Sequence, residues 1–367
     1  MDPTLALLCD LIAIDSVNPG LVPGAAGERA ISEAIALELR SFGADVELTE
    51  IAPGRWNVVG VLQGRAKGRT LMLCGHSDTV GVEGMAAPFT PVMKDGNLHG
   101  RGAQDMKGGI AAILGAARAI TQNGLASGSL VLAFVADEEY MSIGAEAVAK
   151  QWKADGAIIC EPTDLMIAVG HKGFSWVEVT THGRAAHGSR PDEGIDAIVA
   201  MAPILEGLRT LEQRFIAATP HPLLGRPSVH ASLINGGREL STYPDRCMLQ
   251  IERRTVDGEA DDLALREIQS FAGDAETRLT FTRAPYLTPL DSDLPALIDA
   301  AMGGNTKRGA MTYWTDAAIL GHAGIPTVIF GPGGAGLHGI DEYVRTAEVL
   351  TCRDALVRVA ALMSSRA

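Results

Sequence analysis

Short, uninterrupted apolar runs recur along this chain and constrain its fold more than any other feature. They are Trp56–Leu62, Thr70–Cys74, Leu130–Ala136, Ala157–Cys160 and Thr327–Phe330. A strand that is apolar at nearly every position is typical of a sheet buried on both faces. Stretches with the apolar spacing of a helix, such as residues 106–122, lie between the runs. The pattern predicts an α/β fold in which helices flank a mostly parallel central sheet.

The order of expected helices and strands changes between about Gly173 and Thr288. The expected order there is strand, helix, strand, strand, helix and strand, at about 174–181, 192–214, 229–235, 247–255, 259–272 and 278–282. This βαββαβ order is that of a ferredoxin-like unit, and the alternation of apolar and polar residues indicates a sheet with one open face. We therefore predict a second domain over residues 173–288, inserted into a first domain formed by 1–172 and 289–367.

The composition of the chain argues against several classes of function. The chain has 31 Lys+Arg against 44 Asp+Glu, and its net charge of −13 disfavours nucleic acid or an anionic membrane as a partner. No apolar run reaches the roughly 18 residues of a transmembrane helix, and the first twenty residues lack the positive charge of a signal peptide. Five scattered cysteines without a CxxC pair argue against a disulfide framework. We expect a soluble, cytoplasmic protein.

Histidines and carboxylates follow the ends of the apolar runs. They are His76 and Asp78 in GHSDTV, Glu138 and Glu139 in DEE, Glu161 in EPT and His338 in GPGGAGLHG; Asp105, in GRGAQDMKGG, precedes an expected helix. Ligand sites of open α/β sheets lie beyond the carboxyl ends of the strands, so we expect these side chains to converge.

Nitrogen and oxygen donors without a thiolate suit zinc, cobalt or manganese better than copper or an iron–sulfur cluster. Crowded carboxylates also repel one another unless a cation holds them together. Taken alone, a histidine at a strand end is usually structural, and the glycine-rich segment could be a turn; it lacks the lysine of a phosphate-binding loop. The coincidence of such groups at four strand ends favours a metal site.

At this point the sequence resembles a known family. GHSDTV (75–80), GRGAQDMKGG (100–109), DEE (137–139), EPT (161–163), GRAAHGSRP (183–191) and LHGIDEYV (337–344) match, in order and spacing, a family of di-zinc metallopeptidases. The family includes aminoacylase, acetylornithine deacetylase, succinyl-diaminopimelate desuccinylase and glutamate carboxypeptidase. The resemblance covers almost the whole chain, and it implies that the inserted domain serves as a lid and dimerisation domain.

The resemblance also implies roles for the residues at the strand ends. His76 and Glu161 would bind one zinc ion, Glu139 and His338 would bind the other, and Asp105, followed by a cis peptide, would bridge the two. Co²⁺ or Mn²⁺ are possible substitutes for zinc. Asp78 would accept a hydrogen bond from His76, and Glu138 would be the general base that takes a proton from the attacking water.

Further roles follow from the resemblance in and beyond the inserted domain. His187 would reach the active site of the partner subunit in a homodimer, and Arg254 would pair with the carboxylate of the substrate. The adjacent Arg253 should point to the other face of its strand and lie at the surface. Gly333 and Gly334 are expected to contribute to substrate binding.

We therefore expect a zinc-dependent enzyme of amino-acid metabolism that removes the acyl group from an N-acyl amino acid with a free carboxylate. A dipeptidase or carboxypeptidase of the same family is the alternative within the enzyme class. A non-catalytic binding relative is a further alternative, which the intact set of ligands and the intact Glu138 disfavour. The sequence does not decide which acyl group or which amino acid is bound.

Overall fold

The structure is a computed structural model and describes residues 1–365. The chain forms two compact units. The larger unit contains Met1–Val169, Thr288–Ala310 and the residues from Thr315 on, and the smaller contains Gly170–Leu287 and Met311–Trp314. The sequence had assigned Met311–Trp314 to the larger domain. Among residues 1–365, no helix combines the length and the apolarity needed to cross a membrane.

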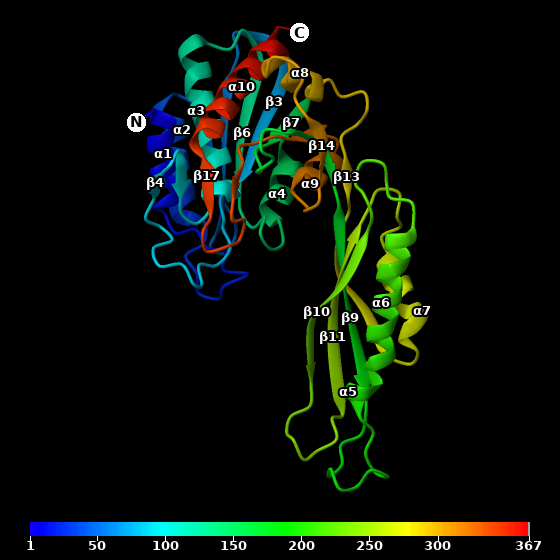
Figure 1. The fold of residues 1–367 in the computed structure, drawn as a ribbon. Helices are drawn as coiled ribbons and strands as arrows, with labels where there is room; N and C mark the ends of the chain where they lie inside the picture. Colours follow the sequence, from blue (N-terminus) through cyan, green and yellow to red (C-terminus); the bar gives the residue numbers. More distant parts are fainter. Residues whose placement is uncertain (366–367) are drawn as a thin grey trace. The chain divides into compact units, whose positions relative to one another are not determined.

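A large sheet organises the larger unit (Figure 1). Its strands are β1 (Asp45–Ala52), β2 (Arg55–Gln63), β3 (Ala66–His76), β6 (Ser127–Val135), β7 (Gly156–Ile159), β8 (Ile167–His171), β13 (Tyr286–Leu287), β14 (Arg308–Met311) and β15 (Thr327–Ile329). They follow the order β1-β2-β6-β3-β7-β15-β8-β13, and β14 pairs with β8. The last residues of β8 and all of β13 belong to the smaller unit.

The sheet is mixed, and its parallel part is confined to the centre. Strands β6, β3, β7 and β15 run parallel to their neighbours within this group, whereas β2 pairs antiparallel with β6 and with β1. Strands β1 and β2 are antiparallel because only the two residues Pro53 and Gly54 connect them. The apolar run in β2 therefore indicates a strand buried on both faces, but it does not indicate the direction of that strand.

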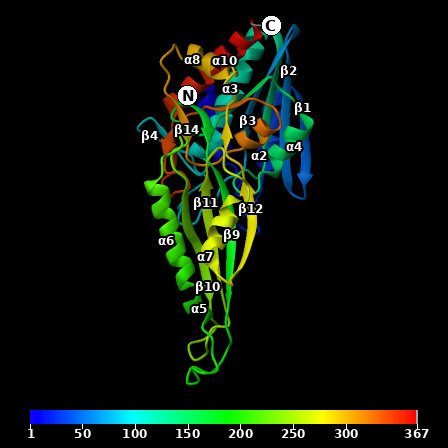
Figure 2. The ribbon, with the colours of Figure 1, turned by 90° about the vertical axis from the view of Figure 1, so that its right-hand side faces the viewer.

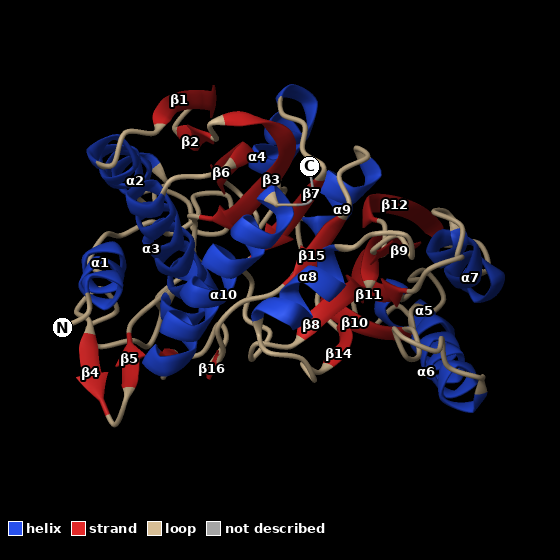
Figure 3. Ribbon diagram, turned by 90° about the horizontal axis from the view of Figure 1, so that it is seen from above, coloured by secondary structure: helices blue, strands red, loops and turns tan. Residues whose placement is uncertain are grey.

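Helices cover both faces of this sheet. They are α1 (Pro3–Ile12), α2 (Arg29–Ser41), α3 (Gly108–Asn123), α4 (Ile143–Gln151), α8 (Leu294–Ala301), α9 (Ala317–His322) and α10 (Thr346–Ser364). Figure 3 shows α2, α3 and α10 along one face and α4 and α9 along the other. The main core lies on the first face, where fully buried residues such as Leu73, Leu132 and Ile113 pack together. The α/β architecture predicted from the sequence is confirmed.

A small second sheet in the larger unit connects two segments that matter for the site. It contains β4 (Val92–Lys94), β5 (Asn97–His99), β16 (Gly334–Ala335) and β17 (Tyr343–Arg345), in the order β16-β17-β5-β4. Strand β17 pairs antiparallel with β5, with Tyr343 opposite His99. This pairing places the residues that precede β17 beside those that follow β5.

The smaller unit has the predicted βαββαβ order. Its elements are β9 (Gly173–His182), α5 (Ala197–Ala200), α6 (Ala202–Ala217), β10 (Ser228–Gly236), β11 (Arg246–Thr255), α7 (Leu263–Ala272) and β12 (Glu276–Arg283). The strand order is β10-β11-β9-β12, and all neighbours are antiparallel. Helices α6 and α7 lie on one face of this sheet (Figure 2) and bury alternate residues of β9 and β11.

The expectation that Arg253 lies at the surface is wrong. Its side chain is only 1% exposed, because it points to the face of β11 that α6 and α7 cover. The Arg253 guanidinium donates hydrogen bonds to Glu259 (2.5 Å) and Glu267 (2.7 Å) and lies over the ring of Phe215. Alternation along β11 correctly placed Arg253 and Arg254 on opposite faces of the strand. The face that carries Arg253, however, is the one that the helices cover.

Replacing Arg253 with Ala should lower the free energy of unfolding by about 3 kcal/mol, because it leaves two carboxylates with little solvent and without their cation. Urea unfolding followed by circular dichroism measures this change. Arg209, whose side chain is 68% exposed beside Glu206, provides the control: Arg209→Ala should leave the unfolding midpoint unchanged. Equal midpoints for Arg253→Ala and the wild type would contradict the structural role.

Candidate metal centre

The predicted ligands converge at the carboxyl ends of the parallel strands. His76 is the last residue of β3, Glu139 lies four residues after β6, and Glu161 lies two residues after β7. Asp105 lies in a short π-helical turn, Ala103–Lys107, directly before α3. His338 lies between β16 and β17 and has a left-handed backbone conformation, with a φ of 59°. These segments bring together side chains that are separated by up to 262 residues in the sequence.

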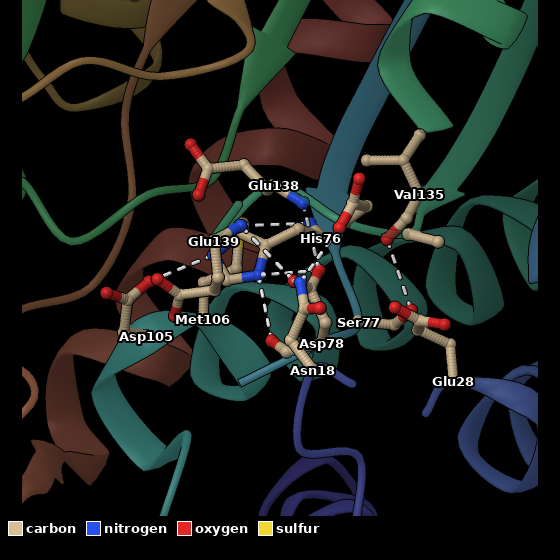
Figure 4. A network of polar contacts seen from close by, with 12 residues as sticks. Asn18, Glu28, His76, Ser77, Asp78, Asp105, Met106, Val135, Glu138 and Glu139 are labelled. Carbon is tan, nitrogen blue, oxygen red and sulfur yellow. Dashed lines mark hydrogen bonds and ion pairs between the residues drawn. The ribbon is translucent and has the colours of Figure 1, made fainter. Parts of the chain in front are cut away.

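Asp105 occupies the middle of the cluster. Its Oδ1 lies 3.0 Å from Nε2 of His76, and its Oδ2 lies 3.3 Å from Nε2 of His338. On the His76 side, Nε2 is also 3.6 Å from a carboxylate oxygen of Glu161. On the His338 side, Nε2 is also 3.3 Å from a carboxylate oxygen of Glu139. The single carboxylate of Asp105 thus joins two histidine–glutamate pairs (Figure 4 shows His76, Asp105 and Glu139).

The ligand atoms lie close enough to hold cations. One ligand atom each from His76, Asp105 and Glu139 lies within 4.8 Å of the others, as do those of His76, Glu138 and Glu161. One buried oxygen of Glu139, Oε1, has no hydrogen-bond partner in the part of the chain that the structure describes. A buried carboxylate oxygen without a donor is costly unless a cation approaches it. Oxygen and imidazole donors with such an orphaned oxygen fit a divalent metal ion.

Both histidines favour the protonated form when no cation is present. Hydrogen bonds to Asp105 and Glu139 raise the pKa of His338 to about 10. Burial alone would lower the pKa of His76, but Glu161 and Asp105 raise it well above its usual value. Since a metal ligand must be a neutral imidazole, binding of a cation here displaces protons.

The carboxylates show the complementary effect of crowding. Burial and the charge of Asp105 raise the pKa of Glu139 to about 7, and burial with the charge of Glu161 raises that of Glu138 well above its usual value. Burial would also raise the pKa of Asp105, but hydrogen bonds from His338 and His76 lower it. The cluster therefore needs positive charge, either as protons or as metal ions.

The role expected for Asp78 differs in detail from the one that the structure shows. Nδ1 of His76 lies 3.0 Å from the backbone carbonyl of Asp78 but 3.7 Å from its carboxylate, so the hydrogen bond goes to the backbone. The carboxylate instead accepts hydrogen bonds from the backbone N–H groups of Glu138 (3.1 Å) and Glu139 (3.2 Å). Asp78 thus orients His76 through its main chain and the DEE segment through its side chain.

Three buried residues near the cluster were missed by the sequence analysis. The Asn18 amide donates hydrogen bonds to Asp78 (2.7 Å) and to Asp137 (3.0 Å). Burial raises the pKa of Asp316 to about 8. Glu342 contacts the segment that carries Asp105. Glu342 lies in the motif LHGIDEYV, which also contains His338, whereas nothing in the sequence marks Asn18 or Asp316 as a site residue.

The remaining predicted site residues have their own local contacts. In the smaller unit, His187 lies in an exposed loop with Nδ1 2.8 Å from the Ser189 hydroxyl, and Arg254 pairs with Glu252 at 2.7 Å. In the larger unit, the N–H of Gly333 donates to Glu348 and Gly334 pairs with β17. Side chains at either glycine would collide with neighbouring atoms. Packing therefore accounts for both glycines, and their role in substrate binding stays a prediction.

The chain is similar over most of its length to several known proteins. Acetylornithine deacetylase of Proteus mirabilis (strain HI4320) is 30% identical over 369 residues, with 95% of this chain and 94% of that protein covered. N-formyl-4-amino-5-aminomethyl-2-methylpyrimidine deformylase of Bacillus subtilis (strain 168) is 29% identical, with 89% and 88% covered. A tripeptidase from Staphylococcus aureus subsp. aureus Mu50 has a similar fold, with a TM-score of 0.80, 20% identity and coverage of 99% and 98%.

Residues 72–362 match the sequence profile of Peptidase family M20/M25/M40. This range contains every proposed metal ligand and the whole of the smaller unit. The chain therefore belongs to Peptidase family M20/M25/M40, and its activity is that of a metal-dependent amide hydrolase.

Proposed function

We propose that this enzyme removes the acyl group from an N-acyl amino acid with the help of two zinc ions. The observation that carries the proposal is the position of Asp105, whose two carboxylate oxygens each face a different imidazole. A carboxylate shared in this way is the arrangement expected of a bridging ligand in a two-metal site. The similarity to acetylornithine deacetylase supports the choice of an N-acyl amino acid.

In the proposed centre, His76 and Glu161 hold one ion, Glu139 and His338 hold the other, and Asp105 holds both. Zinc suits this mixture of imidazole and carboxylate donors, and Co²⁺ or Mn²⁺ could replace it. When bound, the ions would lower the pKa of a water molecule and polarise the amide carbonyl.

Glu138 is the proposed general base. Its carboxylate lies within 4.8 Å of ligand atoms of His76 and Glu161, which places it beside the proposed metal ligands. Asp78 fixes the backbone of Glu138, so the side chain starts from an ordered segment. Glu138 would accept a proton from the water and donate it to the leaving amine. The pKa of Glu138 is raised by burial, which favours a carboxyl group that can both accept and return a proton.

Arg254 is the proposed partner of the substrate carboxylate. It lies on the face of β11 opposite to Arg253, stacks over Phe174 and is 31% exposed while paired with Glu252. A guanidinium stays charged and can bind a carboxylate through two parallel hydrogen bonds. His187 is the proposed residue that stabilises the oxyanion in the active site of a partner subunit.

A peptidase acting on dipeptides or tripeptides is the second candidate, and the structural similarity to a tripeptidase favours it. Both candidates share the metal centre and the amide chemistry. They differ in whether the group on the carbonyl side of the scissile bond is a simple acyl group or an amino acid. Comparing the hydrolysis rates of N-acetyl amino acids and dipeptides with the same carboxyl-terminal residue separates them.

We also propose a homodimer formed through the smaller unit. Strand β10 lies at an edge of its sheet and exposes Leu233 (66%) and Ile234 (55%). Edge strands with exposed apolar residues present backbone groups and apolar surface that a second chain can cover.

The metal proposal predicts about two Zn²⁺ ions per chain, measured by inductively coupled plasma mass spectrometry on dialysed protein. Asp105→Ala should retain well below one ion and lose activity, because it removes the ligand that both ions share. Asp10→Ala, at an exposed position of α1, is the control and should retain the wild-type metal content. An active wild-type enzyme free of divalent metal would refute the two-metal centre.

The base proposal predicts that Glu138→Gln retains its metal and loses about 10²–10⁴-fold in kcat, the usual range for a positioned proton-transfer group. The amide keeps the size of the side chain but cannot accept the proton. Metal analysis and steady-state kinetics on the same preparation distinguish loss of the base from loss of the ions. Turnover close to that of the wild type would exclude Glu138 as the base.

The carboxylate proposal predicts that Arg254→Ala raises KM for an N-acetyl amino acid by about 10²-fold, the cost of losing a charge-assisted hydrogen-bond pair. The same variant should change little with the corresponding carboxamide, which the wild type should hydrolyse poorly. Arg246, an exposed arginine at the start of the same strand, serves as the matched control. Equal wild-type rates on acid and carboxamide would rule out the carboxylate contact.

The dimer proposal predicts a mass of twice 38.5 kDa in sedimentation equilibrium. Leu233→Lys should shift the protein towards the monomer, because it places a charge on the proposed interface. Leu37→Lys, at a position 71% exposed on α2, should leave the mass unchanged. A monomeric wild type would show that β10 does not pair with a second copy.

A further inference from the structure

A single buried carboxylate, that of Glu342, organises the segment that carries Asp105. The backbone N–H groups of Gly102 (2.9 Å), Gln104 (2.9 Å) and Asp105 (3.1 Å) all donate hydrogen bonds to it. The guanidinium of Arg101 donates a fourth at 2.7 Å. Glu342 is 1% exposed and Arg101 is 2% exposed. Glu342 is not among the proposed metal ligands and has no proposed step in catalysis.

The conformation of the Asp105 segment explains why it needs an acceptor from elsewhere. Gly102 has a left-handed backbone with a φ of 76°, and Asp105 has non-helical angles, with a φ of −118° and a ψ of 94°. Gly102 is the N-cap of the turn Ala103–Lys107. The first N–H groups of a helical turn have no carbonyl acceptor within it, so those of Gly102, Gln104 and Asp105 need an acceptor from elsewhere. Buried N–H groups without an acceptor destabilise the folded state, and the oxygens of Glu342 replace the missing carbonyl acceptors.

The small sheet determines where Glu342 lies. Glu342 directly precedes β17, and the pairing of Tyr343 with His99 brings it opposite Gly100, whose N–H donates to the Glu342 carbonyl at 3.2 Å. Glu342 also lies four residues after His338. It therefore connects the segment of Asp105 with the segment of His338, two of the three proposed ligands of one ion.

We propose that Glu342 is a positioning residue that sets the metal affinity of the centre by holding the Asp105 segment against the His338 segment. This inference rests on the metal centre proposed above. Its physical basis is that the side chain of Asp105 can face both imidazoles only while its backbone is held in this non-helical conformation. The negative charge of Glu342 strengthens the four hydrogen bonds, and Arg101 balances it.

Glu342→Gln tests the proposal. The amide keeps the shape of the side chain, but it replaces one acceptor oxygen with a donor group and removes the charge that Arg101 balances. Competition with a chromogenic chelator, using Zn²⁺ alone as the probe, should show metal affinity reduced about 10–100-fold, the range known for residues that orient metal ligands. Titration with Co²⁺ should show an altered visible absorption spectrum, since the shared ligand has moved.

Glu259→Gln is the matched control. Glu259 also accepts hydrogen bonds from a buried arginine, Arg253, and from a backbone N–H, that of Val256, but it lies in the smaller unit. This variant should lose stability and keep the wild-type Zn²⁺ affinity and Co²⁺ spectrum. Equal loss of affinity in both variants would mean that general destabilisation explains the effect, and would overturn the proposal.

The outcomes separate this inference from the proposed function. A wild type that binds no metal would refute the metal centre itself. A wild type that binds metal, with a Glu342→Gln variant of equal affinity, would refute only the role of Glu342. If Glu342→Gln does not fold, Glu342→Asp provides the test: it keeps the charge, is shorter by one methylene and should bind Zn²⁺ more weakly than the wild type. Unchanged affinity in a folded Glu342→Asp variant would then contradict the proposal.

Discussion

Electrostatic repulsion among buried carboxylates is the constraint on which the arrangement of the candidate metal centre depends. Asp105, Glu138, Glu139 and Glu161 converge with only His76 and His338 as nearby proposed ligands able to carry positive charge. The upward pKa shifts of the glutamates and of both histidines are two expressions of the same imbalance. Proteins do not gather acids in this way to gain stability, because the desolvation of each charge is costly. The arrangement is explained by the cations that it can bind.

Holding these acids together requires acceptors for the backbone of the segments that carry them. Asp78 and Glu342 perform the same physical task at two places. Asp78 accepts the N–H groups of Glu138 and Glu139, and Glu342 accepts those of the segment that ends at Asp105. Each is a buried carboxylate that accepts hydrogen bonds from backbone N–H groups. The Asn18 amide also donates to Asp78, and the Arg101 guanidinium also donates to Glu342.

The sequence predicted those parts that follow from burial and from strand ends. Continuous apolar runs predicted the central strands, and their carboxyl ends predicted the convergence of His76, Glu161 and the DEE segment. The orientation of β2 and the covered face behind Arg253 could not be derived, because apolar runs carry no information on strand direction and alternation does not say which face a helix covers. The family resemblance supplied the roles of individual residues, which periodicity alone left open.

Residues that act through the backbone were the hardest to predict, and the reason is topological. Glu342 is 237 residues from Asp105 in the sequence, and only the pairing of β17 with β5 brings them together. Its glutamate side chain has no spacing signature, because its partners are N–H groups that every residue type except proline possesses. A metal ligand can be predicted from its residue type and its place at a strand end. A residue that positions a ligand can be identified only from the strand pairing of the folded chain. The positions of the proposed ligands therefore depend on strand pairings between distant segments, which no local sequence pattern predicts.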